Sequence, residues 1–306
     1  MAGQERVLRR RIRSIQSTQK ITRAVELIAA SRIVRAQQAI TAAAPYAQRM
    51  REVIADLSAA PEVRSHPLFA GTGGAPVVVV MGADRGLCGA FNVSVLRAAE
   101  EVIADAHRQG ETPIVVGVGR KVQSYFRFRG RSLDDTVTGI TDRPKFEDAQ
   151  RVARAVIEAL SDGRAGSVTL VCTDFVNVAS QRVEKHQMVP LKPVEERAST
   201  VSFDFEPDPA EILERLLPLW LEAELYVALL GSAASFHVAQ QRAMKAATDN
   251  ADDLVKTLTR SMNRARQDAI TTEIMEIVGG AEALRQAGLS EALLGRPDVY
   301  VFPEAS

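Results

Sequence analysis

Cysteine, net charge and long apolar runs are all scarce in this chain of 306 residues, and each shortage excludes a class of protein. Only Cys88 and Cys172 are present, far apart, so no disulfide framework is indicated and a reducing compartment fits. The 38 basic side chains balance the 38 acidic ones, so net charge favours neither nucleic acid nor an acidic partner. No uninterrupted apolar stretch approaches the roughly 20 residues that span a bilayer, and no signal peptide is visible. The sequence predicts a soluble chain, although one that could sit on a membrane complex.

Glycine is absent from residues 5–58, and Pro45 is the only proline there. Apolar and small side chains recur along this stretch with alternating spacings of three and four residues. Such spacing over many turns predicts a helix of about 80 Å with a coiled-coil seam, which Pro45 can kink. The seam positions are Leu8, Ile15, Thr22, Ala29, Ala36, Ala43, Met50 and Leu57, alternating with Ile12, Gln19, Glu26, Ile33, Ile40, Ala47 and Ile54.

After a loop at 59–75, short apolar runs alternate with segments of helical periodicity. Strands separated by helices of this length predict a doubly wound, mostly parallel α/β sheet. The run at 183–191 follows a short connection, so we expect it to pair antiparallel at an edge. The predicted strands are 77–81, 114–118, 167–175, 183–191 and a weaker one at 136–140, and the predicted helices are 90–109, 120–129 and 146–162.

Helical periodicity returns at Pro209 and persists to about Leu284. A chain with a long helix at each end most simply folds the two as an antiparallel pair that flanks the α/β domain. The seam is thin, because polar residues and alanines occupy much of it. A buried leucine or isoleucine stabilises by roughly 1.5–3 kcal/mol and an alanine by much less. The pair should therefore be marginal by itself and need a surrounding partner. The predicted parts are an N-terminal shaft helix (1–58), a globular α/β domain (59–208), a C-terminal shaft helix (209–285) and an extension (286–306).

The extension contains Gly288, Gly295 and Pro297, which argue against a simple continuation of the helix. Two interpretations of it stay open: a loosely ordered tail, or a brake on movement of the shaft.

The stretch VVVVMGADRGLCGAFN, residues 77–92, raises the question of nucleotide binding, because strand, glycine-rich turn and helix can cradle a phosphate. A Walker loop fails here, since neither the lysine nor the following hydroxyl is present, and the glycines do not fit GxGxxG. Other chemistry is equally absent from the motifs. No nucleophile elbow occurs, and no histidine has a neighbour at zinc-ligand spacing. The sequence predicts no cofactor, no metal and no catalytic residue; the histidines are His66, His107, His186 and His237.

Two alternatives from other classes remain at this point. The strand, glycines and helix at 77–92 favour a Rossmann-like enzyme with helical arms. The arginine-rich start at 6–35 favours a coiled coil that binds nucleic acid, with strongly salt-dependent affinity.

Three segments resemble the gamma subunit of bacterial F-type ATP synthases: 10–37 (RRIRSIQSTQKITRAVELIAASRIVRAQ), 82–92 (GADRGLCGAFN) and 242–284 (RAMKAATDN…GGAEAL). They occur in the family's order and at its distances, and the third is long and specific. The resemblance implies a non-catalytic central-stalk rotor subunit that couples proton flow to ATP synthesis or hydrolysis. It implies alpha, beta and epsilon subunits and a c-subunit ring as partners, with no nucleic acid. The implied location is peripheral, on the cytoplasmic side of the cell membrane.

The resemblance also implies roles for particular residues. Arg266 and Gln267 match a pair that hydrogen-bonds an acidic loop of a beta subunit. Asp84 and Arg85 match a turn near the collar where the globular domain faces beta. Val25 stands where the family usually has methionine, at the entrance of the surrounding sleeve.

The chain departs from the family pattern at two further places. Gly231 and Phe236 stand where glutamates are usual, so two carboxylates that could pair with the basic N-terminal helix are missing. The chloroplast insert with its regulatory cysteine pair is also absent, so thiol control is not expected.

Overall fold

The computed structural model describes residues 2–58, 63, 69, 73–191 and 208–294. Within these ranges the chain forms two compact units. We call Met1–Ile21 with Ala247–Ser306 the helix-pair unit and Thr22–Ala246 the sheet unit. The long helices α1 (Ala2–Leu57) and α7 (Pro209–Leu294) each contribute to both units.

The sheet unit is built on five strands in the order β3-β2-β1-β4-β5. The first four are parallel and β5 is antiparallel at the edge, as the sequence predicted. The strands are β1 (Ala75–Met81), β2 (Ile114–Val118), β3 (Asp135–Val137), β4 (Ala165–Phe175) and β5 (Gln181–Val189). Strand β5 begins and ends two residues earlier than the predicted range of 183–191. Strand β3 has 3 residues and is shorter than the predicted range of 136–140.

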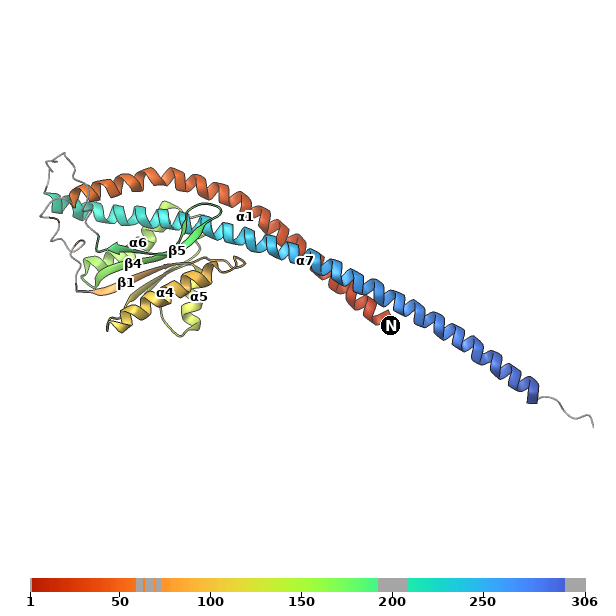
Figure 1. Cartoon of the computed structure of the whole chain (residues 1–306). Helices are drawn as coiled ribbons and strands as arrows, with labels where there is room; N and C mark the ends of the chain where they lie inside the picture. The colour runs from red at the N-terminus through yellow and green to blue at the C-terminus, as the bar shows by residue number, and fades with distance from the viewer. Residues whose placement is uncertain (1, 59–62, 64–68, 70–72, 192–207, 295–306) are drawn as a thin grey trace, which may run out of the picture. The chain divides into compact units, whose positions relative to one another are not determined.

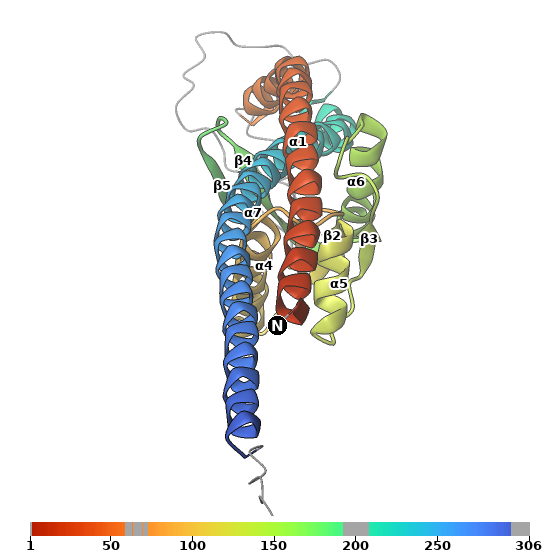
Figure 2. The same ribbon diagram turned by 90° about the vertical axis from the view of Figure 1, so that its right-hand side faces the viewer.

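Helices cover both faces of this sheet (Figure 1), and Figure 2 shows the same elements turned by 90°. Because neighbouring side chains in a strand point to opposite faces, the valine run of β1 supplies both cores. Val77 and Val79 pack with α1, α6 and α7, whereas Val78 and Val80 pack with α4 and α5. A continuous apolar run of this kind is typical of a strand that is buried on both faces of its sheet. The helices of the sheet domain are α4 (Phe91–Arg108), α5 (Arg120–Phe128) and α6 (Phe146–Ser161).

The buried residues of α1 confirm the predicted seam. Every described buried residue of this helix is one of the predicted seam positions. The buried glutamate among them, Glu26, is held by Arg23 of the same helix at 3.0 Å. The helix continues through Pro45 without a break in its assignment. The buried seam residues are Ile12, Thr22, Glu26, Ala29, Ile33, Ala47, Met50, Ile54 and Leu57.

Helices α1 and α7 run antiparallel within each unit. In the sheet unit Arg51 of α1 binds Glu224 of α7, with Nε to Oε1 at 2.5 Å. In the helix-pair unit the Gln19 amide nitrogen lies 3.5 Å from Asp252 Oδ1. Ile12 is the only buried residue among the described side chains of the helix-pair unit. The seam is thus as thin as the sequence indicated.

Helix α7 continues to Leu294, nine residues beyond the predicted end of the shaft. Gly288 therefore lies inside the helix, although we expected this glycine to help end it. A glycine costs about 1 kcal/mol in a helix interior but does not forbid helix, and no proline follows until Pro297. Residues 295–306, with Gly295 and Pro297, lie outside the described residues.

One stretch of α7 passes a membrane-helix test by length and composition. An 18-residue window within Glu211–Gln286 has a mean hydropathy of 1.3, and 44% of it is buried inside the protein. A core helix passes the same test, and the first part of α7 packs against the sheet. Length and composition alone therefore do not distinguish this helix from the core helix of a folded domain.

Candidate functional site

Arg266 and Gln267, the predicted coupling pair, lie side by side on α7 in the helix-pair unit. Both side chains are exposed. Within the described part of the chain, neither has a hydrogen-bond or ion-pair partner. The guanidinium fork offers several N–H donors in a plane, and the amide offers a donor and an acceptor. The structure leaves both groups available for another protein.

The end of α7 beyond this pair is exposed on all sides to solvent within the described chain. No residue of α7 from 247 to 286 is buried, and all side chains from 273 to 286 are exposed. Large apolar side chains are among them, and exposed apolar groups of this extent mark protein interaction surfaces. We call this the apolar end of α7; its members are Ile270, Ile274, Met275, Ile277, Val278 and Leu284.

Val25, the third predicted contact, lies in the sheet unit and is half-buried on α1, next to the buried Glu26. The short valine side chain is therefore only partly available to a partner.

Asp84 is held inside the sheet unit by its own chain. Its Oδ1 accepts hydrogen bonds from the backbone N–H of Arg120 at 3.1 Å and of Gly139 at 2.8 Å. Its Oδ2 accepts from the backbone N–H and the hydroxyl of Thr141, at 3.0 and 2.9 Å. Burial by itself would raise the pKa of Asp84, but these donors together lower it below the usual value. Asp84 thus ties the turn after β1 to the start of α5 and to the loop after β3.

Arg85 is the exposed member of the predicted turn, with 63% of its side chain accessible. Its Nε lies 2.9 Å from Oδ2 of Asp142, and Arg32 of α1 approaches the same oxygen at 3.3 Å. The backbone carbonyl of Asp142 contacts Nε2 of the buried His237 of α7 at 3.2 Å. Asp142 therefore joins the turn after β1 to both long helices. Sequence reasoning missed it, because a single acidic residue in a loop carries no motif.

The carboxyl ends of β1 and β4, where a doubly wound sheet usually binds a nucleotide, are covered by α7. Phe236 of α7 packs edge-to-face on Phe91 at the start of α4, with ring centroids 5.7 Å apart. The space left beside them is about 10 Å³, roughly enough for one water molecule. A nucleotide cannot enter this gap, although an open hollow of about 430 Å³ lies next to it, lined by Gly89, Thr173 and Arg242. Phe236 is buried in an apolar cluster, where the carboxylate that the resemblance led us to expect would lose its hydration.

Gly231, the other departure, faces the backbone of β4. A Cβ atom there would lie 3.7 Å from the nitrogen of Phe175, an ordinary contact distance. Close packing therefore does not require glycine at this position.

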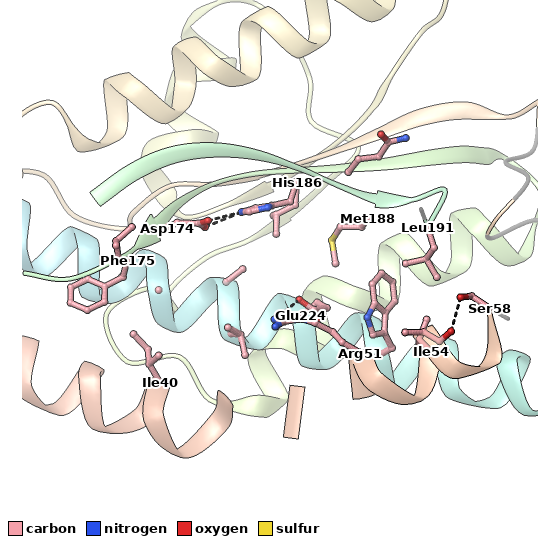
Figure 3. Close-up of a pocket in the computed structure, with 18 of the residues that line it drawn as sticks. Ile40, Arg51, Ile54, Ser58, Asp174, Phe175, His186, Met188, Leu191 and Glu224 are labelled. Atoms are coloured by element: carbon pink, nitrogen blue, oxygen red, sulfur yellow. Dashed lines mark hydrogen bonds and ion pairs between the residues drawn. The ribbon is translucent and has the colours of Figure 1, made fainter. Parts of the chain in front are cut away.

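A cavity of about 710 Å³ lies between the β4–β5 edge of the sheet and the paired helices (Figure 3). Arg51 and Glu224 pair on its helical wall, and Asp174 and His186 pair on its sheet wall. Trp220 and Met188 supply apolar surface. The cavity combines apolar walls with two charged pairs, which is the usual composition of a small-molecule or ion site.

Three groups that could ligate a metal meet at this wall: Cys172, Asp174 and His186. Burial and the neighbouring Asp174 carboxylate raise the pKa of the Cys172 thiol. The hydrogen bond that the His186 Nε2–H donates to the Asp174 carboxylate raises the pKa of His186. The sequence predicted no metal, because Asp174 and His186 are twelve residues apart and on different strands. Only the antiparallel pairing of β4 with β5 brings them together.

The filled carboxyl edge, the thin helical seam and the free polar and apolar groups on α7 define a class of protein. Exposed groups of this kind are typical of a subunit of a larger assembly.

Comparison with known proteins gives the family. The family model described as ATP synthase matches residues 4–284. The ATP synthase gamma chain of Parafrankia sp. (strain EAN1pec) is 44% identical over 298 residues, covering 93% of this chain and 99% of the relative. That of Frankia casuarinae is 45% identical over 295 residues, with the same coverage. The chain belongs to the ATP synthase gamma-chain family.

Solved structures agree on the fold. The Euglena gracilis mitochondrial ATP synthase OSCP/F1/c-ring structure contains a chain with a TM-score of 0.63 and 14% identity. The match covers 99% of this chain and all of the other. A chain of the Tetrahymena thermophila mitochondrial ATP synthase central stalk and c-ring matches with a TM-score of 0.55 at 23% identity, over 74% of this chain and 99% of the other.

Proposed function

We propose that this chain is the rotor of the central stalk and that it performs no catalysis itself. Proton flow through a ring of c subunits turns the chain, and the turning helices force the beta subunits through their nucleotide-binding cycle. The observation that carries the proposal is the state of α7: from 273 to 286 every described side chain is exposed, although several are apolar. A surrounding ring of alpha and beta subunits would cover them.

We propose that both units of the chain contact other subunits of the complex. We assign the grip on a beta subunit to Arg266 and Gln267, because both are free of partners within the described chain. At the turn after β1, we assign any contact with the ring of alpha and beta subunits to Arg85. The carboxylate of Asp84 is already occupied by four hydrogen bonds from its own chain. Val25 would lie at the entrance of the ring. The epsilon subunit and the c ring would bind the sheet unit, which places the chain peripherally on the cytoplasmic side of the membrane.

A single-molecule rotation assay tests this proposal. Val178, in the turn between β4 and β5, is 44% exposed. A cysteine placed there can carry a bead while alpha and beta subunits, co-expressed with the chain, are fixed to a surface. We expect the bead to rotate in steps when ATP is added and to stop when ATP is removed. Hydrolysis by an assembled complex whose bead stays still would contradict the rotor role.

The thin seam predicts that the chain needs its partners for stability. We expect the isolated chain to melt at a modest temperature and to aggregate, because Ile12 is the only buried residue among the described side chains of the helix-pair unit. Co-expression with alpha and beta subunits should keep it in solution. Calorimetry of the isolated chain, with light scattering, measures both properties. Cooperative melting of a monomer above about 70 °C would show that no surrounding ring is needed.

A further inference from the structure

The Cys172, Asp174 and His186 side chains converge at the β4–β5 edge. Cys172 and Asp174 are two residues apart on β4, so they share one face of the sheet. His186 reaches them from β5, where it pairs with Leu170 in the register. Figure 3 shows His186 and Asp174 pointing toward one another across the two strands.

The distances among the three groups approach those of a metal site. The Cys172 sulfur lies 3.4 Å from Asp174 Oδ1, and His186 Nε2 lies 2.9 Å from Asp174 Oδ2. One ligand atom from each residue falls within 4.8 Å of the other two. Zinc binds sulfur at about 2.3 Å and nitrogen or oxygen at about 2.0–2.2 Å, so tetrahedral geometry separates neighbouring ligand atoms by roughly 3.3–3.6 Å. Small side-chain rotations would bring the three atoms to those separations.

The chemistry of the three ligands selects the ion. Magnesium and calcium prefer oxygen ligands alone, whereas thiolate with imidazole and carboxylate suits zinc. Three protein ligands leave a fourth position for water or another small ligand. Asp174 and His186 line the cavity of about 710 Å³, so that position has room and access.

Charges of both signs surround the three groups, because Arg182 lies opposite Asp174 in the strand register and Glu184 lies on the same strand. Glu184 lies opposite Cys172 in the register of β4 and β5. Glu224 of α7 also lines the cavity, where Arg51 neutralises it. A divalent cation bound between these strands would therefore be attracted by Asp174 and Glu184.

We propose that Cys172, Asp174 and His186 form a zinc site that fastens the edge strand β5 to β4 and leaves one coordination position open to the cavity. Binding replaces the thiol proton: the Zn–S bond forms, the S–H bond breaks, and the proton passes to the solvent. His186 binds through Nε2 as a neutral imidazole: the Nε2 proton that is hydrogen-bonded to Asp174 passes to the solvent, Nδ1 carries the remaining ring proton, and the ion takes the place of the hydrogen bond.

Cobalt substitution tests the site on the full-length chain, kept in solution by co-expression with alpha and beta subunits and freed of metal with a chelator. Co²⁺ bound to a thiolate gives a charge-transfer band in the near ultraviolet. We expect one Co²⁺ per chain with this band, displaced by one equivalent of Zn²⁺. Cys172→Ser should abolish the band and weaken Zn²⁺ binding by more than about 100-fold, since loss of a supporting group alone costs 10–100-fold. Chelator competition measures the affinity.

Matched variants keep the test decisive. Cys88→Ser removes the other buried thiol, which is hydrogen-bonded to Asn92, and His107→Gln removes an exposed histidine outside the site. Both should keep the band and the wild-type affinity. If Cys172→Ser does not fold, His186→Gln decides, because His186 is half-exposed on an edge strand and its loss should also weaken Zn²⁺ binding by more than about 100-fold. Absence of the band in the wild-type chain with a large excess of Co²⁺, or its persistence in Cys172→Ser, overturns the proposal.

Discussion

Replacing Arg266 and Gln267 together with alanine should leave the ATP synthase complex assembled and lower both ATP synthesis and ATP hydrolysis. A hydrogen bond to a charged group contributes roughly 1.5–3 kcal/mol. Losing it from one rotary step corresponds to a rate lower by about ten- to a hundredfold, since each 1.4 kcal/mol is about tenfold. Both side chains are exposed and unpaired within the described chain, so their removal should not disturb the fold.

The measurements are the two rates of the purified, membrane-reconstituted complex, with subunit content checked by gel. Arg266→Lys should rescue only in part, because lysine keeps the charge but lacks the planar fork. Arg264→Ala is the matched control for Arg266, since it removes an exposed arginine of the same helix whose side chain points about 160° away from that of Arg266. Wild-type rates in both directions from a correctly assembled double variant would remove the pair from the coupling mechanism.

Replacing Asp84 with asparagine should loosen the sheet unit around the turn after β1. The carboxylate accepts two backbone N–H groups on one oxygen and an N–H with a hydroxyl on the other. In asparagine an NH2 group replaces one of the two carboxylate oxygens. The buried groups that donated to that oxygen then face another donor and lose their acceptor. We expect a loss of about 2–4 kcal/mol, since unsatisfied buried groups cost about 1–3 kcal/mol each.

Hydrogen exchange of the co-expressed complex measures this loss locally. Exchange of the amides of Arg120, Gly139 and Thr141 should accelerate by about 30-fold or more, as each 1.4 kcal/mol is about tenfold. Asp105→Asn is the control, because Asp105 is exposed and pairs only with Arg108 of its own helix. Unchanged exchange in Asp84→Asn would show that the four hydrogen bonds do not hold the turn.

The same variant should change the response of the protein to acid. The folded pKa of Asp84 lies below its unfolded value of about 3.8, so its contribution is present above that pH and is lost as the pH falls through the folded pKa. Wild type and Asp84→Asn should therefore differ fully above about pH 4 and converge only as the pH falls through the lowered folded pKa. A difference in exchange that stayed constant down to the lowest pH would contradict the lowered pKa.

The sequence by itself determined the elements, the seam and the family. The valine run at 77–80 can form only a strand buried on both faces, because no polar side chain alternates with the apolar ones. The spacing in residues 5–58 placed every buried residue of α1 on the predicted stripe, since helical periodicity depends on neighbours along the chain. Three long segments in the family's order sufficed for the resemblance, which the curated relatives confirm.

Only the tertiary structure decided how distant side chains are used. Asp84 belongs to the matched turn, yet its carboxylate faces Gly139 and Thr141, more than 50 residues away. Phe236 blocks the carboxyl edge of the sheet because α7 crosses it, and no local pattern at 77–92 could reveal that. Cys172, Asp174 and His186 come together through strand register, which sequence spacing does not encode. Elements follow from local periodicity, whereas a site of scattered residues exists only after folding has brought them together.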